Sequence, residues 1–167
     1  GYDFKILNSV ISVNERQRTK LVKIVKNYFK GALRGKTLAI WGLSFKPHTD
    51  DIREAPSLYS IDAFLDEGAS VHVHDPEAMD NARRYFGNRI QYFDTPYAAA
   101  TGADALVIMT EWPEFRSPDF DALSACLIGK VIFDGRNLYD LNLMREAGFA
   151  YYSIGREVIE PLRTLKV

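Results

Sequence analysis

The apolar positions along the first thirty residues follow a helical period. Residues 3–31 contain no proline and no glycine before Gly31. Asp3 is a suitable N-cap and Gly31 a suitable C-cap, so this pattern predicts one long helix. The apolar positions that recur at helical spacing are Leu7, Val10, Ile11, Leu21, Val22, Val25, Tyr28 and Phe29.

Such a helix would be about 40 Å long, because each residue adds about 1.5 Å. A small domain does not need that length to cover its own core. The excess favours a spine that packs against another domain or subunit. The alternative is a solvated helix with one buried stripe.

After Gly35 the pattern changes to short apolar runs that alternate with helical segments. This alternation is typical of a parallel sheet covered by crossover helices. Residues 105–109 are apolar throughout, which fits a strand buried on both faces. Strands are predicted at residues 37–41, 70–74, 90–93, 105–109, 130–133 and 150–154. Helices are predicted at residues 56–67, 77–86, 95–101, 118–126 and 141–147.

These elements predict an α/β fold, a Rossmann-like doubly wound parallel sheet of about six strands preceded by one long helix. The expected strand order is 3-2-1-4-5-6, with a topological switch between the first and fourth strands. We divide the chain into the helix, residues 1–34, and the Rossmann-like domain, residues 35–167. The chain starts with Gly1 instead of Met, which suggests a fragment or a tag remnant.

Composition narrows the classes of partner. With 21 basic and 22 acidic residues the formal net charge is −1, which argues against nucleic acid and membrane surfaces as partners. No apolar run is long enough to span a bilayer and no signal-peptide pattern is present, so we expect a cytoplasmic protein. Cys126 is the only cysteine, which excludes an intrachain disulfide and a multi-cysteine metal site.

Three loops are expected to share one crevice, because they follow the first, fourth and fifth strands. They are residues 44–57, 110–115 and 134–137. Lys46 and Arg136 in these loops could approach one diphosphate from two sides, the lysine as a point charge and the arginine as a bidentate fork. Each could instead be a solvated surface charge.

Several other side chains have two interpretations. Trp112 and Phe115 could stack on a base or cap the edge of the sheet. His72 and His74 share one face of a strand, as a zinc pair would, but no third ligand is evident, and we predict no metal site. The cluster of Asp50, Asp51 and Glu54 is better explained by salt bridges and loop capping than by magnesium.

Dinucleotide binding of the usual kind is not expected in this domain. The G-x-G-x-x-G turn is absent, since residues 42–46 (GLSFK) keep only the first glycine. Asp75 ends the second strand, where a ribose-binding carboxylate often lies, but without that turn we interpret it as a cap for the next helix. Cys126 lies in an apolar helical context and is interpreted as a small buried hydrophobe, not as a nucleophile.

Four motifs in order resemble the UDP-glucose/GDP-mannose dehydrogenase family, and in particular its UDP-glucose 6-dehydrogenases. They are residues 42–57 (GLSFKPHTDDIREAPS), 110–115 (TEWPEF), 133–138 (FDGRNL) and 152–156 (YSIGR). Members of the family have an N-terminal NAD-binding Rossmann domain, a long central helix that forms the dimer, and a C-terminal Rossmann-like domain that helps to bind the UDP-sugar. The resemblance implies that this chain is the central helix plus the last domain.

The resemblance also implies roles for individual residues. Phe45 and Lys46 match substrate-contacting positions, with the lysine near the sugar, and Arg136 matches an arginine that contacts the substrate. Arg53 matches an arginine that reaches the NAD held by the other domain. The helix residues 14–16 match the family's central helix, where packing and capping explain them as well as a catalytic role does.

For the whole protein, the resemblance implies oxidation of UDP-glucose to UDP-glucuronate with NAD as the cofactor, and a homodimer formed through the long helix. The family's catalytic cysteine lies in a Gly-Gly-Ser-Cys type motif that this chain lacks, so the chain alone is expected to be inactive. A stand-alone, non-catalytic nucleotide-binding or regulatory module is the alternative. Related enzymes act on UDP-N-acetylmannosamine or GDP-mannose, and the motif set favours UDP-glucose.

Overall fold

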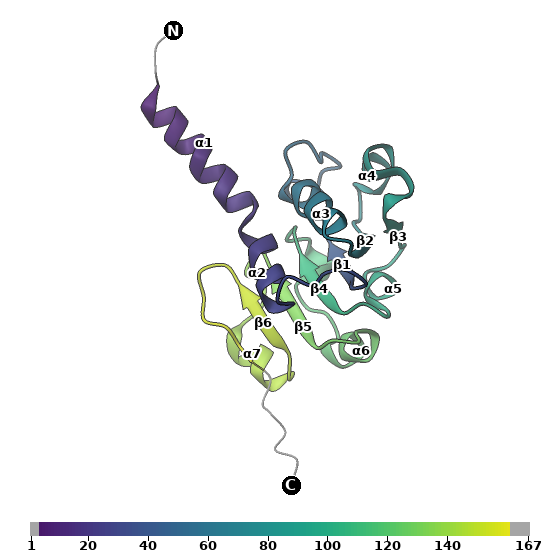
Figure 1. Ribbon diagram of the computed structural model, residues 1–167. Helices are drawn as coiled ribbons and strands as arrows, with labels where there is room; N and C mark the ends of the chain where they lie inside the picture. The colour runs from purple at the N-terminus through teal and green to yellow at the C-terminus, as the bar shows by residue number, and fades with distance from the viewer. Residues whose placement is uncertain (1–3, 161–167) are drawn as a thin grey trace.

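The computed structural model describes residues 4–160 of the chain, which form one twisted parallel sheet with helices on both faces (Figure 1). The six strands lie in the order β3-β2-β1-β4-β5-β6, as the sequence predicts. The strands are β1 (Thr37–Trp41), β2 (Ser70–His74), β3 (Gln91–Tyr92), β4 (Ala105–Ile108), β5 (Val131–Asp134) and β6 (Ala150–Ser153). All five neighbouring pairs are parallel, so the loops that follow β1, β4 and β5 leave the same edge.

Strand β1 shows why the sheet needs helices on both sides. Leu38 and Ile40 belong to one hydrophobic cluster, and Ala39 and Trp41 belong to a second cluster on the opposite face. All four side chains are buried, because successive residues of a strand point to opposite faces. Burial on both faces explains why the strands are apolar runs and do not alternate with polar residues.

The helices divide between these two clusters. The first cluster includes residues of α2 (Lys20–Tyr28), α3 (Pro56–Asp66) and α4 (Met79–Phe86). The second includes residues of α5 (Pro96–Ala100), α6 (Phe120–Cys126) and α7 (Leu141–Glu146). Two short 3-10 helices, Gly87–Arg89 and Pro113–Phe115, complete the set. The ends of the strands and of α3 to α7 differ from the predicted ones by no more than two residues, which is the usual scatter at frayed ends.

The predicted N-terminal helix is present but divided at Thr19 into α1 (Lys5–Arg18) and α2. The Thr19 hydroxyl lies 3.3 Å from the carbonyl oxygen of Arg16 and 3.4 Å from that of Glu15, the kind of back-bonding that bends helices. Helix α2 packs on the sheet through Leu21, Val22 and Val25. Helix α1 has no buried residue and extends away from the body (Figure 1).

The two predicted caps of this helix have different outcomes. Asp3, the predicted N-cap, lies outside the described residues. At the other end, α2 stops at Tyr28, and the Gly31 amide donates a 2.8 Å hydrogen bond back to the carbonyl of Lys26. Gly31 has a φ of 77°, a left-handed conformation that favours glycine. It therefore completes the helix end as expected, three residues beyond the last helical residue.

Candidate functional site

A cleft of about 470 Å³ lies at the edge of the sheet where the strands end. Three of its walls come from the loops after β1, β4 and β5, so the prediction that these loops share a crevice is confirmed. The end of α1 and the start of α2 form a further wall, which the sequence did not indicate. Its lining residues are Asn14, Gln17, Arg18, Leu21, Phe45, Lys46, Glu54, Pro56, Met109, Glu111, Gly135, Arg136 and Ile154.

The loop after β1 is held in place by its own backbone and by buried side chains. The Phe45 amide donates to the carbonyl of Asp51 at 2.9 Å, and the Ser57 hydroxyl donates to the carbonyl of Leu43 at 2.5 Å. Ile52 and Leu43 are buried, and they anchor the loop to the core. These contacts leave Phe45 and Lys46 exposed at the cleft. Within residues 4–160, the Lys46 ammonium forms no ion pair, so its charge is available to an anion.

Arg136 ties the three loops together. Its Nε donates to the carbonyl of Met109 at 2.7 Å, and its Nη2 donates to the carbonyl of Phe45 at 2.9 Å. The Glu111 carboxylate lies 3.0 Å from the same Nε. Lys46 and Arg136 thus line one cleft, as predicted, but one edge of the guanidinium is already occupied by the chain itself. Its remaining Nη1 has no partner among the described residues and is available to a ligand.

The backbone that carries Arg136 is braced by a buried carboxylate. Asp134 accepts hydrogen bonds from the amides of Arg136 and Leu138 and from the hydroxyl of Tyr151, each at 2.7 Å. Burial, followed by the negative charge of Asp134, raises the pKa of Tyr151 above its ordinary value, which keeps this hydroxyl a donor. Asn137 adds a second brace, since its side chain pairs with both backbone groups of Ile154 at 3.0 Å.

The structure places Arg53 apart from Lys46 and Arg136. Its guanidinium forms a bidentate pair with Asp51, at 2.9 and 2.8 Å, and its side chain is 87% exposed. This pairing holds the pKa of Asp51 at about 2. Arg53 lines a second hollow, between its own loop, α3 and α4, that does not include Lys46 or Arg136. The two cations that were predicted to contact the substrate therefore line one cleft, and the arginine that was predicted to contact the cofactor lines a different hollow.

On the side of β1 toward β2, the buried carboxylate of Asp75 ties the loop after β1 to the turn that leads into α4. One oxygen of this buried carboxylate accepts from the amides of Leu43 and Ser44, from the Ser44 hydroxyl and from the indole of Trp112, at 2.6 to 3.2 Å. The other oxygen accepts from the amides of Glu77 and Ala78 at 2.9 and 2.8 Å. Asp75 therefore caps the turn that leads into α4, as predicted, and it also seals the loop after β1.

Because of these hydrogen bonds to Asp75, the loop after β1 does not offer the free amides that usually bind the diphosphate of a dinucleotide. In a Rossmann turn the free amides of the glycine-rich loop donate to the diphosphate. Here the amides of Leu43 and Ser44 are bonded to Asp75. Gly42 is needed for packing, because a Cβ at that position would lie 2.5 Å from Thr110 Cβ. The structure thus supplies a physical reason for the absence of a dinucleotide turn.

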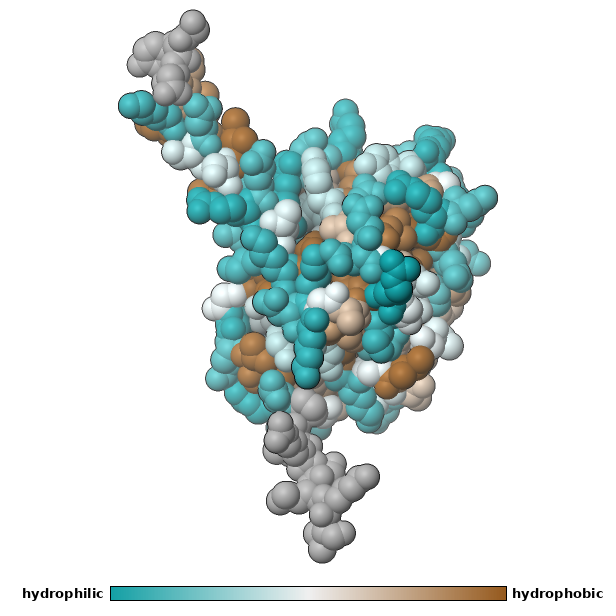
Figure 2. Space-filling model, viewed as in Figure 1, coloured by the Kyte–Doolittle hydropathy of each residue, from teal (hydrophilic) through white to brown (hydrophobic). Residues whose placement is uncertain are grey.

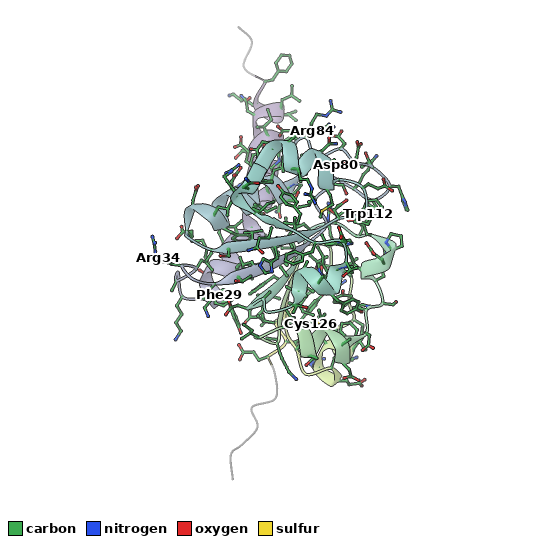
Figure 3. All side chains as sticks on the ribbon, turned by 90° about the vertical axis from the view of Figure 1, so that its right-hand side faces the viewer. Phe29, Arg34, Asp80, Arg84, Trp112 and Cys126 are labelled. Carbon is green, nitrogen blue, oxygen red and sulfur yellow. The ribbon has the colours of Figure 1, made fainter. Side chains whose placement is uncertain are left out.

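The remaining sequence candidates have structural roles. Trp112 and Phe115 are buried, and Phe115 stacks on Trp41, so they close the sheet edge as expected. Figure 3 shows Trp112 and Cys126 at separate places on the domain. Cys126 is partly buried against the second hydrophobic cluster, in agreement with a packing role.

The two histidines and the acidic cluster hold the structure together. His72 and His74 contact the backbone carbonyls of Ala99 and Phe93, and His74 also pairs with Glu114. No group of three metal-ligating side chains occurs among the described residues. The acidic residues are satisfied locally by ion pairs or hydrogen bonds: Asp51 with Arg53, Glu54 with Arg18 and Tyr59, and Asp50 with Asn81.

Comparison with known proteins identifies the family. The model of the UDP binding domain of the UDP-glucose/GDP-mannose dehydrogenase family matches residues 39–141. The chain belongs to this family. The match confirms the family that the four sequence motifs indicated, and it covers the cleft residues Phe45, Lys46 and Arg136.

The relatives of this domain are named as dehydrogenases and are longer than this chain. Over 161 residues the chain is 45% identical to a UDP-glucose 6-dehydrogenase of Pseudomonas aeruginosa, and the match covers 93% of this chain but 36% of the relative. A UDP-glucose dehydrogenase from the hyperthermophilic archaeon Pyrobaculum islandicum has a TM-score of 0.72 and 34% identity, over 87% of this chain and 31% of that one. A UDP-D-ManNAc dehydrogenase from Pyrococcus horikoshii has a TM-score of 0.73 and 26% identity, over 93% and 34%. The chain thus spans about a third of the length of these relatives.

Some cleft residues were missed by sequence reasoning. Gln17 and Arg18 line the cleft from α1, and nothing in the periodicity of the helix distinguishes them from solvated positions. Glu111 lines it from the loop after β4. Its signal was present, because it belongs to the TEWPEF motif, but no role had been assigned to it.

Among the described residues, no helix combines the length and the apolar character that crossing a membrane requires.

Proposed function

We propose that this chain is the UDP-sugar-binding part of an NAD-dependent UDP-glucose 6-dehydrogenase, which oxidises UDP-glucose to UDP-glucuronate. In this proposal the catalytic cysteine and the main NAD-binding domain lie outside the chain. The observation that carries it is the cleft at the strand ends, where Lys46 and Arg136 come together within a domain of this family.

The chemistry of the cleft suits a nucleotide sugar. Among residues 4–160 the Lys46 ammonium and the Arg136 Nη1 have no partner, so both cations are available to a diphosphate. Phe45, which is 49% exposed, supplies an apolar surface beside them. UDP-glucose is the preferred substrate because the relatives named for it are 45% and 34% identical to this chain, and the one named for UDP-D-ManNAc is 26% identical.

The proposal assigns NAD to the absent domain. The amides after β1 are bonded to Asp75, so this domain does not supply the usual diphosphate cradle. Arg53 is exposed beyond the rim of the cleft, which suits a side chain that reaches a cofactor held by another domain. Cys126 is not the catalytic thiol of this proposal, because it packs against the second hydrophobic cluster.

The exposed apolar side chains of helix α1 support the inference that a partner covers this helix. Its apolar side chains Ile6, Leu7, Val10, Ile11 and Val13 are exposed, and Figure 2 shows this apolar surface along the projecting helix. A self-sufficient regulatory module would not need such a face. The proposal therefore includes a homodimer formed through α1 and contact with the NAD-binding domain. The cytoplasmic location expected from the sequence stays a prediction.

Calorimetric titration of the purified chain with UDP-glucose, and separately with NAD⁺, tests the proposal. We expect UDP-glucose to bind and NAD⁺ not to bind. Replacing Lys46 with alanine should weaken UDP-glucose binding roughly tenfold to a hundredfold, the usual effect of losing a charged hydrogen bond. Lys46 is a cleaner target than Arg136, which also links two backbone carbonyls.

The matched control is Lys130→Ala, which removes an exposed lysine just before β5, at the opposite edge of the sheet. This variant should bind UDP-glucose as the native chain does. Tight NAD⁺ binding without UDP-glucose binding would refute the proposal in favour of a dinucleotide domain. Equal losses in the two lysine variants would show that the cleft is not the site.

A further inference from the structure

The Glu111 carboxylate is an unsatisfied acceptor inside the cleft. Its Oε2 is enclosed and lies 3.0 Å from Arg136 Nε, but the hydrogen on that Nε is directed at the carbonyl of Met109, 2.7 Å away. Across residues 4–160, Glu111 accepts no hydrogen bond. The side chain as a whole is 31% exposed and lines the cleft, so a ligand there can reach the carboxylate.

A carboxylate in this position needs an explanation. Buried polar atoms nearly always have a hydrogen-bond partner, and leaving one without a partner costs free energy. Arg136 does not require Glu111 for its own hydrogen bonds, because two backbone carbonyls already take its Nε and Nη2. Glu111 is therefore ion-paired with Arg136, but none of residues 4–160 uses its capacity to accept a hydrogen bond.

The negative charge of Glu111 also opposes the binding of an anion in the cleft. Lys46 and Arg136 attract phosphate, and a carboxylate 3.0 Å from Arg136 weakens that attraction. A ligand that offers only phosphate meets this repulsion and makes no hydrogen bond that satisfies the carboxylate. A ligand that also carries hydroxyl groups can donate to Glu111 and recover the cost, since a site built to accept a hydroxyl discriminates strongly against ligands without one.

We propose that Glu111 is a specificity-determining residue of the cleft: its carboxylate accepts a hydrogen bond from a hydroxyl of the nucleotide sugar and disfavours ligands that present phosphate alone. This inference rests on the proposed function of the cleft. In this proposal Glu111 acts through both its charge and its hydrogen bond. Removing the charge should therefore weaken the binding of UDP-glucose and strengthen the binding of a ligand that presents phosphate alone.

The test compares UDP-glucose with inorganic pyrophosphate, titrated calorimetrically into the native chain and into Glu111→Gln, which keeps the shape but removes the charge. We expect UDP-glucose to bind roughly tenfold more weakly, because a charge-assisted hydrogen bond is lost. Pyrophosphate should bind severalfold more tightly, because a repulsive charge is removed. Glu146→Gln, an exposed change at the end of α7, should alter neither affinity.

A second variant guards against a folding artefact. Glu111→Asp keeps the charge but shortens the side chain, so pyrophosphate should bind as weakly as to the native chain while UDP-glucose binding falls. Thermal melts of each variant establish that it is folded before titration. This pair of variants separates the charge of Glu111 from its reach.

Each other outcome has a definite meaning. Equal weakening of both ligands in Glu111→Gln would show that Glu111 only supports Arg136, and would overturn the inference. Tighter binding of both ligands would show that Glu111 acts through its charge alone. It would overturn the inference that its carboxylate accepts a hydrogen bond from a hydroxyl. No change in either would also overturn it, while the proposed function would stand. If the native chain binds pyrophosphate but not UDP-glucose, the proposed function fails and the inference fails with it.

Discussion

The two sides of β1 at the strand-end edge make opposite use of a buried carboxylate. On the side toward β2, Asp75 accepts six hydrogen bonds from loops and from Trp112, so the donors around it are already used within the chain. On the side toward β5, Asp134 braces the backbone of Arg136, and a cleft of about 470 Å³ stays open. The same edge of the sheet thus has a sealed side, where the donors are bonded within the chain, and a side with an open cleft.

The comparison shows that strand order places candidate sites but does not decide which of them binds. A doubly wound sheet offers a crevice wherever the strand order reverses. Whether that crevice accepts a ligand depends on whether its amides and cations are already bonded within the chain. In this domain the backbone amides are used internally, and a lysine and part of an arginine are left for a ligand.

The sealed side should be the more sensitive to mutation. Replacing Asp75 with alanine leaves several buried donors without an acceptor, and we expect the free energy of unfolding to fall by about 4 kcal/mol or more. Urea denaturation measures this change. Asp80→Ala, an exposed residue of α4, is the control and should cost little. A loss below about 1 kcal/mol in Asp75→Ala would show that the seal is not a stabilising network.

Gly42 tests the close packing beneath the same seal. Its φ is 93°, and an added Cβ would lie 2.5 Å from Thr110 Cβ and 2.6 Å from the Thr110 amide nitrogen. Gly42→Ala should therefore cost about 2 to 4 kcal/mol, from backbone strain plus overlap. Gly148→Ala separates the two causes, because Gly148 also has a positive φ but nothing lies within 4 Å of its added Cβ.

For Gly148→Ala we expect the strain alone, about 1 to 2 kcal/mol. The same denaturation experiment measures both variants. If Gly42→Ala and Gly148→Ala lower the free energy of unfolding equally, then Thr110 moves to make room for the added Cβ. The sealed side would then be less rigid than its hydrogen bonds imply.

On the open side, Tyr151→Phe removes the hydroxyl that donates to Asp134 and should cost about 1 to 2 kcal/mol of stability. UDP-glucose binding should also weaken, because Asp134 positions the backbone of Arg136. Calorimetry measures the affinity and urea denaturation the stability. Tyr152→Phe is the matched control, since no described residue accepts a hydrogen bond from that hydroxyl. If Tyr151→Phe binds UDP-glucose as tightly as the native chain, the hydrogen bond from Tyr151 to Asp134 does not help to position Arg136.

The smallest effect on stability is expected from the exposed Asp51–Arg53 pair, which lines the second hollow. The hydrogen bond from Arg53 lowers the pKa of Asp51 from its ordinary 3.8 to about 2. The folded carboxyl holds its proton less tightly than the unfolded one, so the pair stabilises the fold above about pH 4 and this contribution is lost as the pH falls toward 2. An NMR titration of the Asp51 carboxyl should give a midpoint well below 3.8. A midpoint at the ordinary value would show that the bidentate pair does not persist in solution.

Much of the fold was predictable because local patterns report burial. The apolar runs predicted all six strands and their order, and the position of Asp75 after β2 predicted its capping role. The division of the first helix at Thr19 was not predicted, because a helical period continues on both sides of it. The apolar stripe also did not show that α2 is buried and α1 is exposed, since that depends on where the sheet ends.

The sequence by itself determined the strand order, the edge where a ligand can bind and the family, because periodicity and short motifs are local properties. The tertiary structure decided which side chains meet there. Arg136 contacts the Phe45 carbonyl across 91 residues of sequence, and Glu111 lies beside Arg136. Such contacts follow from how the loops pack against one another, and no local pattern encodes them. The sealed side and the open cleft differ for the same reason.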